Sequence, residues 1–177
     1  MMFFCRYKSP VGLLTITSDG QNITGIWLEG QKYFAATMDS EAIEKEVPVF
    51  DSARRWLDLY FAGKEPDFAL PLAPKGSEFR QAVWEILCRI PFGSVITYGD
   101  IAKQLVKKSD GKKVSAQAVG GAVGHNPISI VIPCHRVVGS NGSLTGYAGG
   151  IDKKVFLLEL EKVAMDNLFV PKKGTAL

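Results

Sequence analysis

Residues 124–137 read GHNPISIVIPCHRV, and the interpretation of the whole chain starts from this stretch. Asn126-Pro127 ends a preceding run that is rich in glycine and alanine, and a short apolar run follows at residues 128–132. A continuous apolar run bounded by turn signals is typical of a buried extended segment. The sequence therefore predicts that a buried extended run leads directly into Cys134 and His135.

Cys134 is the sharpest chemical feature of this stretch. A thiol is a nucleophile only as the thiolate, so a reactive cysteine needs a group that takes its proton. His135 is adjacent, but neighbouring side chains in an extended segment point in opposite directions, so a bridging water or a sharp turn would have to connect the two. Glu161 could orient the imidazole, although spacing alone leaves this open. The alternative is a small buried cysteine beside a structural histidine, and this structural role is the one expected for Cys5 and Cys88.

Two short helices are predicted upstream of this stretch, at about residues 97–105 and 115–123. Thr97 and Asp100 form a capping-box pattern at the start of the first helix, and the polar loop 107–113 separates it from the second. Such a pair resembles a helix-turn-helix, which places its second helix against a nucleic-acid groove.

The second helix of this pair consists mostly of alanine and glycine. Small residues lower helix stability, so they indicate the close approach of something large, either a phosphate backbone or another helix. The lysines in the preceding loop could contact phosphates, or could simply form a solvated basic surface.

The first part of the chain reads as a sheet with one helix. Strand-like runs at residues 3–7, 13–17 and 23–28, with a turn at Asp19-Gly20, predict an antiparallel hairpin or meander. A helix is expected from Pro48 to Ala62. The prolines and glycine of residues 64–76 break regular structure and indicate a linker. We therefore expect an α+β chain with two domains, residues 1–76 and a mostly helical domain at residues 77–177.

Composition limits the function classes. The 177 residues are 46% hydrophobic and 22% charged, which fits a globular protein and excludes disordered and fibrous classes. No apolar run approaches the roughly 18 residues of a membrane span. The three cysteines are an odd number with no CxxC pair, which favours a reducing, cytoplasmic location over a disulfide framework.

Charge is distributed unevenly along the chain. Residues 1–76 carry 8 Lys+Arg against 10 Asp+Glu, a balance of −2, whereas residues 77–177 carry 13 against 8, a balance of +5. A mildly basic second half hints at a polyanionic partner.

Taken together, these motifs resemble the O6-alkylguanine-DNA alkyltransferases. The active-site signature of that family is similar to Pro133–Val137 preceded by Gly124–Pro127. Four further segments match in order: the first DNA-binding helix at residues 97–102, the recognition helix at 118–122, the substrate loop at 146–150 and the closing helix at 157–161. The first 76 residues resemble the family's ribonuclease-H-like amino-terminal domain more loosely.

The resemblance implies a role for each catalytic position. Cys134 would accept the alkyl group from O6 of guanine. His135 would take the thiol proton through a water, and Glu161 would hold the imidazole, which is the logic of a nucleophile, base and orienter. Asn126 would tie the recognition helix to the active-site segment, and Tyr98 would donate a proton to the departing guanine.

The resemblance also implies how substrate and DNA would be held. Backbone groups of Cys134 and Val137 would contact the exocyclic amine of the base, a backbone N–H near Ala148 would bind O6, and Tyr147 would form a wall of the pocket, with Gly149 in the same loop. The target nucleotide would be flipped out of double-stranded DNA, with the recognition helix in the minor groove. The DNA-binding residues expected on this basis are Lys112, Lys113, Ser115, Gln117, Ala118 and Gly121.

Two departures from the family pattern carry expectations of their own. Gln117 stands where many relatives have an arginine that fills the gap left by the flipped base, so we expect flipping with weaker non-specific DNA affinity. Some relatives bind zinc in the amino-terminal domain, but only Cys5 could serve here, so we expect no metal. No cofactor is expected either, because Cys134 is itself the acceptor and the protein would be consumed by one reaction.

Three other functions explain the sequence less completely. A lesion-binding protein of the same architecture would lack the acceptor cysteine, which is present. A Cys-His hydrolase would need an oxyanion hole and would leave the helix pair without a role. A plain helix-turn-helix regulator would leave the glycine-rich loop and His135 unexplained. We expect a monomer that acts on O6-alkylguanine, with O4-methylthymine as a second candidate lesion.

Overall fold

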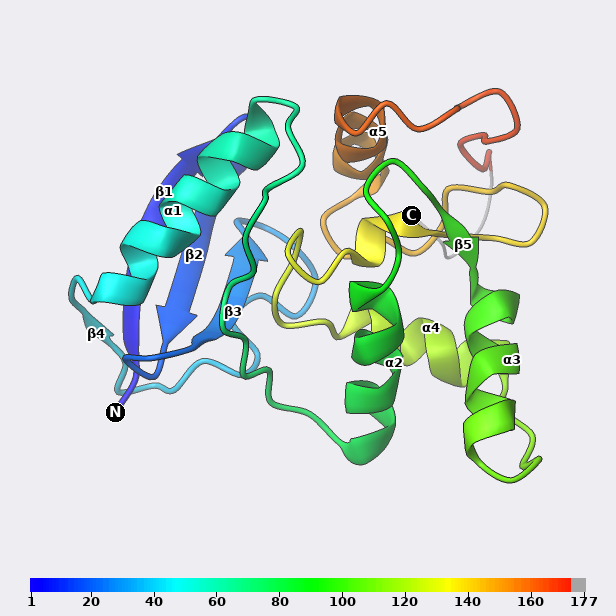
Figure 1. The fold of residues 1–177 in the computed structure, drawn as a ribbon, viewed down its shortest axis with the longest axis horizontal. Helices are drawn as coiled ribbons and strands as arrows, with labels where there is room; N and C mark the ends of the chain where they lie inside the picture. Colours follow the sequence, from blue (N-terminus) through cyan, green and yellow to red (C-terminus); the bar gives the residue numbers. More distant parts are fainter. Residues whose placement is uncertain (173–177) are drawn as a thin grey trace. The chain divides into compact units, whose positions relative to one another are not determined.

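The computed structural model describes residues 1–172 and divides them into two compact units (Figure 1). The first unit comprises Met1–Lys75 together with Pro127–Ser129. The second comprises Gly76–Asn126 and the described residues from Ile130 onward. The small sheet and the helices of this described part confirm the predicted α+β class. None of the helices within residues 1–172 is long and apolar enough to cross a membrane.

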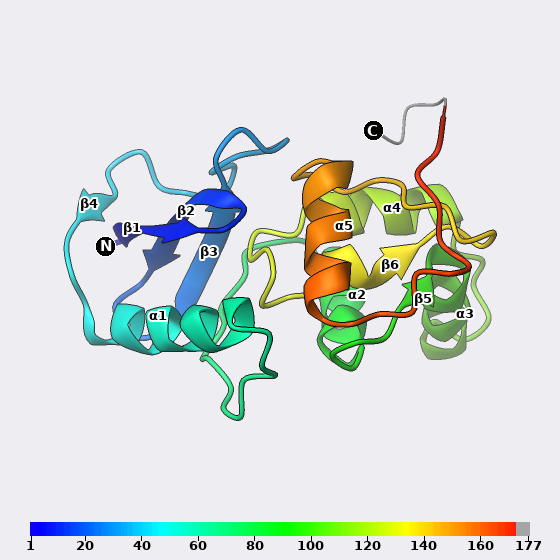
Figure 2. The same cartoon turned by 90° about the horizontal axis from the view of Figure 1, so that it is seen from above.

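The first unit is a four-stranded sheet with one helix on one face (Figure 2). The antiparallel meander and the helix are confirmed, and α1 packs Phe50, Leu57 and Tyr60 inward. A two-residue strand with exposed side chains was not predicted, because it carries no hydrophobic pattern. The elements are β1 (Phe3–Ser9), β2 (Gly12–Ser18), β3 (Ile23–Leu28), β4 (Ile43–Glu44) and α1 (Pro48–Phe61), in the sheet order β3-β2-β1-β4 with β4 parallel to β1.

Two distant segments pair with the outer side of β3. Ala73 N–H donates to Ile23 O at 2.9 Å, and Ser129 N–H donates to Ile26 O at 2.9 Å. These bonds satisfy backbone groups that an edge strand would otherwise leave unpaired. The segment Pro127–Ser129 thereby completes the first unit although it lies far downstream in the sequence.

The prediction of an extended run at residues 128–132 is wrong. Only Ile128 forms a bridge to the sheet, and the chain then turns, with Ile130 at φ 72°. Ile130 is nonetheless completely buried. A β-branched residue at positive φ is rare, so the apolar pattern reported burial correctly but could not report the turn.

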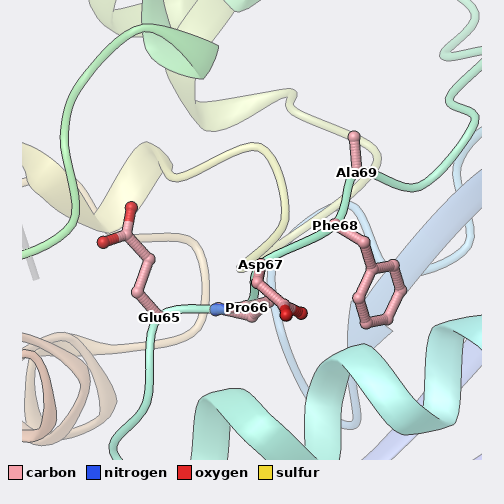
Figure 3. Close-up of a pocket in the computed structure, with 5 residues that line it drawn as sticks. All are labelled: Glu65, Pro66, Asp67, Phe68 and Ala69. Carbon is pink, nitrogen blue, oxygen red and sulfur yellow. The ribbon is translucent and has the colours of Figure 1, made fainter.

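Residues 62–76 connect the two units irregularly. The Arg55 guanidinium lies 4.6 Å from the centroid of the Phe68 ring, which fixes part of this segment to α1. Figure 3 shows a pocket lined by residues 65–69 of the same segment. The pocket has none of the cysteine, histidine or tyrosine side chains that the expected reaction needs.

The second unit is mostly helical. Three of its helices begin at side-chain caps: Ser77, Thr97 and Ser115 each accept a backbone N–H, and Thr97 forms the expected capping box with Asp100. Trp84 Nε1 donates to Ala122 O at 2.9 Å and holds α4 against α2. The elements are α2 (Glu78–Cys88), β5 (Ile96–Thr97), α3 (Tyr98–Lys108), α4 (Ala116–Gly124), the 3₁₀ turn η1 (Cys134–Arg136), β6 (Val137–Val138) and α5 (Ile151–Leu160), with β5 and β6 parallel.

The inward face of α5 differs from the expected one. The sequence predicts a last helix at about residues 152–163 whose inward side chains include Phe156, but Phe156 is 38% exposed. Lys154 is completely buried, on the same face as Leu157 and Leu158. The helix therefore presents a lysine to the interior of the second unit.

Candidate active site

Cys134 and His135 lie in a single 3₁₀ turn, a sharp turn of the kind that the sequence left open as an alternative to a bridging water. Arg136 N–H donates to Pro133 O at 3.0 Å and closes the turn. A 3₁₀ helix has three residues per turn, so successive side chains are rotated by about 120° around its axis. Adjacent residues therefore do not point to opposite sides, as they do in a strand. Cys134 is 6% exposed and His135 is fully buried.

Glu161 is placed against His135 by the C-terminal end of α5. His135 Nε2 and Glu161 Oε2 are 2.5 Å apart, and the second carboxylate oxygen accepts from Arg136 Nε at 2.8 Å. Gly93 N–H also donates to that oxygen at 3.0 Å, and Arg136 Nη1 donates to Ile90 O at 2.7 Å. The carboxylate is therefore held from three directions, and it fixes the imidazole in turn.

The electrostatics of this cluster keep the carboxylate charged. Burial alone would raise the pKa of Glu161, but the hydrogen bonds and charges of His135 and Arg136 outweigh it and bring the pKa to about 2. Burial lowers the pKa of His135, against the opposing effect of Glu161. A neutral imidazole that donates Nε2–H to the carboxylate has Nδ1 as its acceptor nitrogen, which is the form a base requires.

Asn126 connects the end of α4 to the segment before Cys134. Its Nδ2 donates to Ile132 O at 2.7 Å, and Cys134 N–H donates to the same oxygen at 2.8 Å. Burial raises the pKa of the Cys134 thiol, while a hydrogen bond from Asn126 and the charge of Lys154 act in the opposite direction. The thiol is therefore protonated at rest and needs a base before it can attack.

Lys154 connects three parts of the site: α5, on which it lies, β6 and the glycine-rich loop. Its Nζ donates to Val137 O at 2.5 Å and to Thr145 O at 2.9 Å, and burial lowers its pKa to about 8. Tyr98 Oη donates to the same Thr145 oxygen at 3.1 Å, and burial raises the Tyr98 pKa to about 12. A Cβ at Gly146 would lie 2.7 Å from Tyr98 Oη, so only glycine lets the loop approach this hydroxyl.

The glycine-rich loop brings the expected substrate residues beside the turn. The Tyr147 ring packs edge-on against His135 with centroids 6.4 Å apart. Ala148 and Gly149 are half-buried, and Val137 is fully buried on β6. Gly150 N–H donates to Tyr147 O at 3.1 Å and begins α5. The structure thus gathers the expected catalytic and substrate residues in the second unit.

The expected DNA-binding residues lie on the exposed side of α4 and in the loop before it. A Cβ built on Gly120, Gly121 or Gly124 would meet no described atom within 4 Å. Packing within residues 1–172 therefore does not require these glycines. The exposed residues are Lys112, Lys113, Ser115, Gln117, Ala118 and Gly121.

Two residues of the site were missed by sequence reasoning. Arg136 lies within the signature but was given no role, and Lys154 was not singled out. The signal for Lys154 was its spacing, because it lies three and four residues before the buried Leu157 and Leu158. Within residues 1–172 no three His, Cys, Asp or Glu side chains gather as metal ligands, and the absence of zinc stays a prediction.

Comparison with known proteins extends over both units. The ribonuclease-like domain of 6-O-methylguanine DNA methyltransferase matches residues 2–74, and the DNA-binding domain of the same family matches residues 78–163. The chain belongs to the 6-O-methylguanine DNA methyltransferase family. The resemblance inferred from the sequence motifs is therefore confirmed.

Individual relatives of this family are similar along most of their length. The methylated-DNA--protein-cysteine methyltransferase of Haemophilus influenzae is 43% identical over 163 residues, which cover 92% of this chain and 87% of the relative. The crystal structure of the Mycobacterium tuberculosis O6-methylguanine methyltransferase matches with a TM-score of 0.78 and 41% identity, covering 92% of this chain and 93% of that one. A second M. tuberculosis structure, OGT in complex with DNA, gives a TM-score of 0.78 and 40% identity over 90% and 92% of the two chains.

Proposed function

We propose that the protein repairs DNA by moving the alkyl group of O6-alkylguanine onto its own Cys134. The observation that carries the proposal is a group of three buried side chains. Cys134 is the nucleophile, and His135 next to it is a neutral base. The Nε2 of His135 is held by the ionised carboxylate of Glu161. Family membership supports the same reaction, since the relatives are named methylated-DNA--protein-cysteine methyltransferases. A single transfer would consume the protein, because nothing in the site offers to cleave the thioether.

The atoms of the reaction balance without a cofactor. The S–H bond of Cys134 breaks and its proton passes to His135, while the sulfur electron pair forms a bond to the alkyl carbon. The C–O6 bond breaks, and Tyr98 supplies a proton to the ring so that a neutral guanine leaves. Lys154 holds the carbonyl of Val137, which would accept from the exocyclic amine, and through Thr145 it shares an acceptor with Tyr98.

Double-stranded DNA is the proposed partner, and α4 is the proposed contact. The M. tuberculosis relative that was solved with DNA supports this. A flipped base would leave a gap in the stack that Gln117 fills, while the open surface at Gly121 lets the backbone come close. Gln117→Ala should slow repair of methylated duplex but leave repair of free O6-methylguanine unchanged, with exposed Gln21→Ala as the matched control. Equal repair rates for Gln117→Ala and the wild-type protein would contradict this role.

One experiment tests the proposed function directly. The protein is incubated with duplex DNA carrying O6-methylguanine, and the intact mass of the protein is measured. We expect a gain of one methyl group that maps to Cys134 and is absent in Cys134→Ala, with Cys88→Ala as the control that retains it. Repeated turnover without a mass gain would favour a hydrolase, and binding without a mass gain would favour a lesion-binding protein.

Finer parts of the proposal have their own tests. The protein is proposed to act as a monomer, which light scattering of the free and DNA-bound forms measures. O4-methylthymine is proposed as a second, poorer substrate in the same mass assay. The free thiols of Cys5, Cys88 and Cys134 support a reducing, cytoplasmic location, which fractionation of the source cells checks.

A further inference from the structure

The hydroxyl of Tyr147 stands out among the buried polar groups of the site. The side chain is 5% exposed, and its Oη is enclosed without a hydrogen-bond partner among the described residues. Buried hydroxyls are nearly always hydrogen-bonded, because an unpaired one loses its hydration without compensation. Phenylalanine would fill the same space without this penalty, so the hydroxyl does not serve the stability of the fold.

The surroundings of this hydroxyl point to the thiol and its base. The Tyr147 ring meets the His135 ring edge-on, at an interplanar angle of 84°. Burial raises the pKa of the phenol, and the charges of Cys134 and Glu161 raise it further, so the group keeps its proton and lies within the field of both. A phenol that keeps its proton is a permanent hydrogen-bond donor, and its ring lies against the imidazole of the base.

We propose that the Tyr147 hydroxyl holds the water through which the Cys134 thiol proton reaches His135. The inference rests on the alkyl transfer proposed above. The water accepts the proton from Sγ as it gives one of its own to His135 Nδ1, while Tyr147 donates a hydrogen bond to the water oxygen and keeps its proton. Because Oη has no direct hydrogen-bond partner among the described residues, it acts through such a bridging water. Tyr147 is thus a positioning residue, beyond the wall that its ring provides.

The test is Tyr147→Phe, which removes the hydroxyl and keeps the ring. We expect the single-turnover rate at saturating methylated DNA to fall by about tenfold, which is less than the roughly 100-fold or greater loss expected for removal of the base itself, because His135 remains in place. The affinity for the DNA should not change, and the thermal midpoint should stay equal or rise. The matched control is Tyr7→Phe, whose hydroxyl donates to Asp58 in the first unit at 2.5 Å, and which should lower stability while leaving the rate unchanged.

A double variant separates the proton path from simple packing. If Tyr147 acts through the same water as His135, then Tyr147→Phe adds no further loss to His135→Gln, because groups that act as one unit are not additive. Additive losses would overturn the proposal, and so would a wild-type transfer rate in Tyr147→Phe or a slower rate explained by weaker DNA binding.

Labelling of Cys134 with iodoacetamide keeps this inference distinct from the proposed function. The reagent reports thiol deprotonation without DNA, and Tyr147→Phe should label about tenfold more slowly than wild type, in line with its loss of transfer rate. Slower labelling in a protein that gains no methyl from DNA would refute the repair function but sustain the role of Tyr147. Equal labelling alongside normal methyl transfer would refute the role and sustain the function.

Discussion

The charge of Glu161 gives a quantitative prediction. Its pKa is about 2 in the folded protein against an ordinary 4.5, which corresponds to about 3 kcal/mol of stability at neutral pH. The folded-state pKa is depressed, so this stability is fully present above pH 4.5 and is lost as the pH falls towards 2. Glu161→Gln should therefore lower the free energy of unfolding by about 3 kcal/mol at pH 7, because it also leaves Arg136 as a buried cation without its carboxylate.

Urea unfolding at two pH values measures this effect. At pH 3.5 wild-type Glu161 retains only about 2 kcal/mol of its contribution, so the deficit of Glu161→Gln should shrink by more than 1 kcal/mol between pH 7 and pH 3.5. Glu159→Gln, on the exposed side of α5, is the matched control and should change stability by less than about 0.5 kcal/mol at either pH. A deficit that is the same at pH 7 and pH 3.5 would show that packing and not charge is lost, and would refute the reasoning.

Three further predictions concern the reaction and the loop beside it. Burial lowers the pKa of His135 below 6.5. The transfer rate should therefore stay constant from neutral pH down to about pH 6.5 and fall at lower pH, where the base becomes protonated. A rate that is already half-maximal above pH 6.5 would contradict this. Gly146→Ala should lower the free energy of unfolding by about 1–3 kcal/mol and slow alkyl transfer, because the new Cβ would meet Tyr98 Oη and the residue has a φ of 74°. An unchanged thermal midpoint together with an unchanged transfer rate would refute the close approach. Lys154→Met should change the free energy of unfolding by less than about 2 kcal/mol, because the loss of two hydrogen bonds is offset by the removal of a buried charge. The same variant should slow transfer at least tenfold in the mass assay. A wild-type rate would show that Lys154 has no role in the reaction.

Local signals predicted the helix starts of the second unit well. The capping box of Thr97 and Asp100 and the cap at Ser115 depend on a few neighbouring residues, so the sequence carries them completely. The expected meander and α1 were confirmed for a similar reason, since alternation and helical spacing are local patterns. Boundaries of these elements differ from the expected ones by only a few residues.

Features that depend on tertiary context were not predicted. The turn at Ile130 has an apolar sequence that suits a strand, and only the rest of the fold imposes its positive φ. Lys154 was missed because its partners are backbone carbonyls of Val137 and Thr145, which no side-chain motif reveals. A sharp turn at Cys134 was one of two alternatives left open by the sequence, and only the structure identifies it as a 3₁₀ turn shared by the two adjacent residues.

The segment Pro127–Ser129 has a consequence for synthesis of the chain. Because Ser129 N–H and Pro127 O pair with Ile26 in the first unit, the outer side of β3 stays incomplete until these residues have left the ribosome. Domains usually fold one after another as the chain emerges from its amino end. Here the nascent amino-terminal unit is completed only after all of α2, α3 and α4 have been translated, so its folding overlaps with synthesis of the second unit.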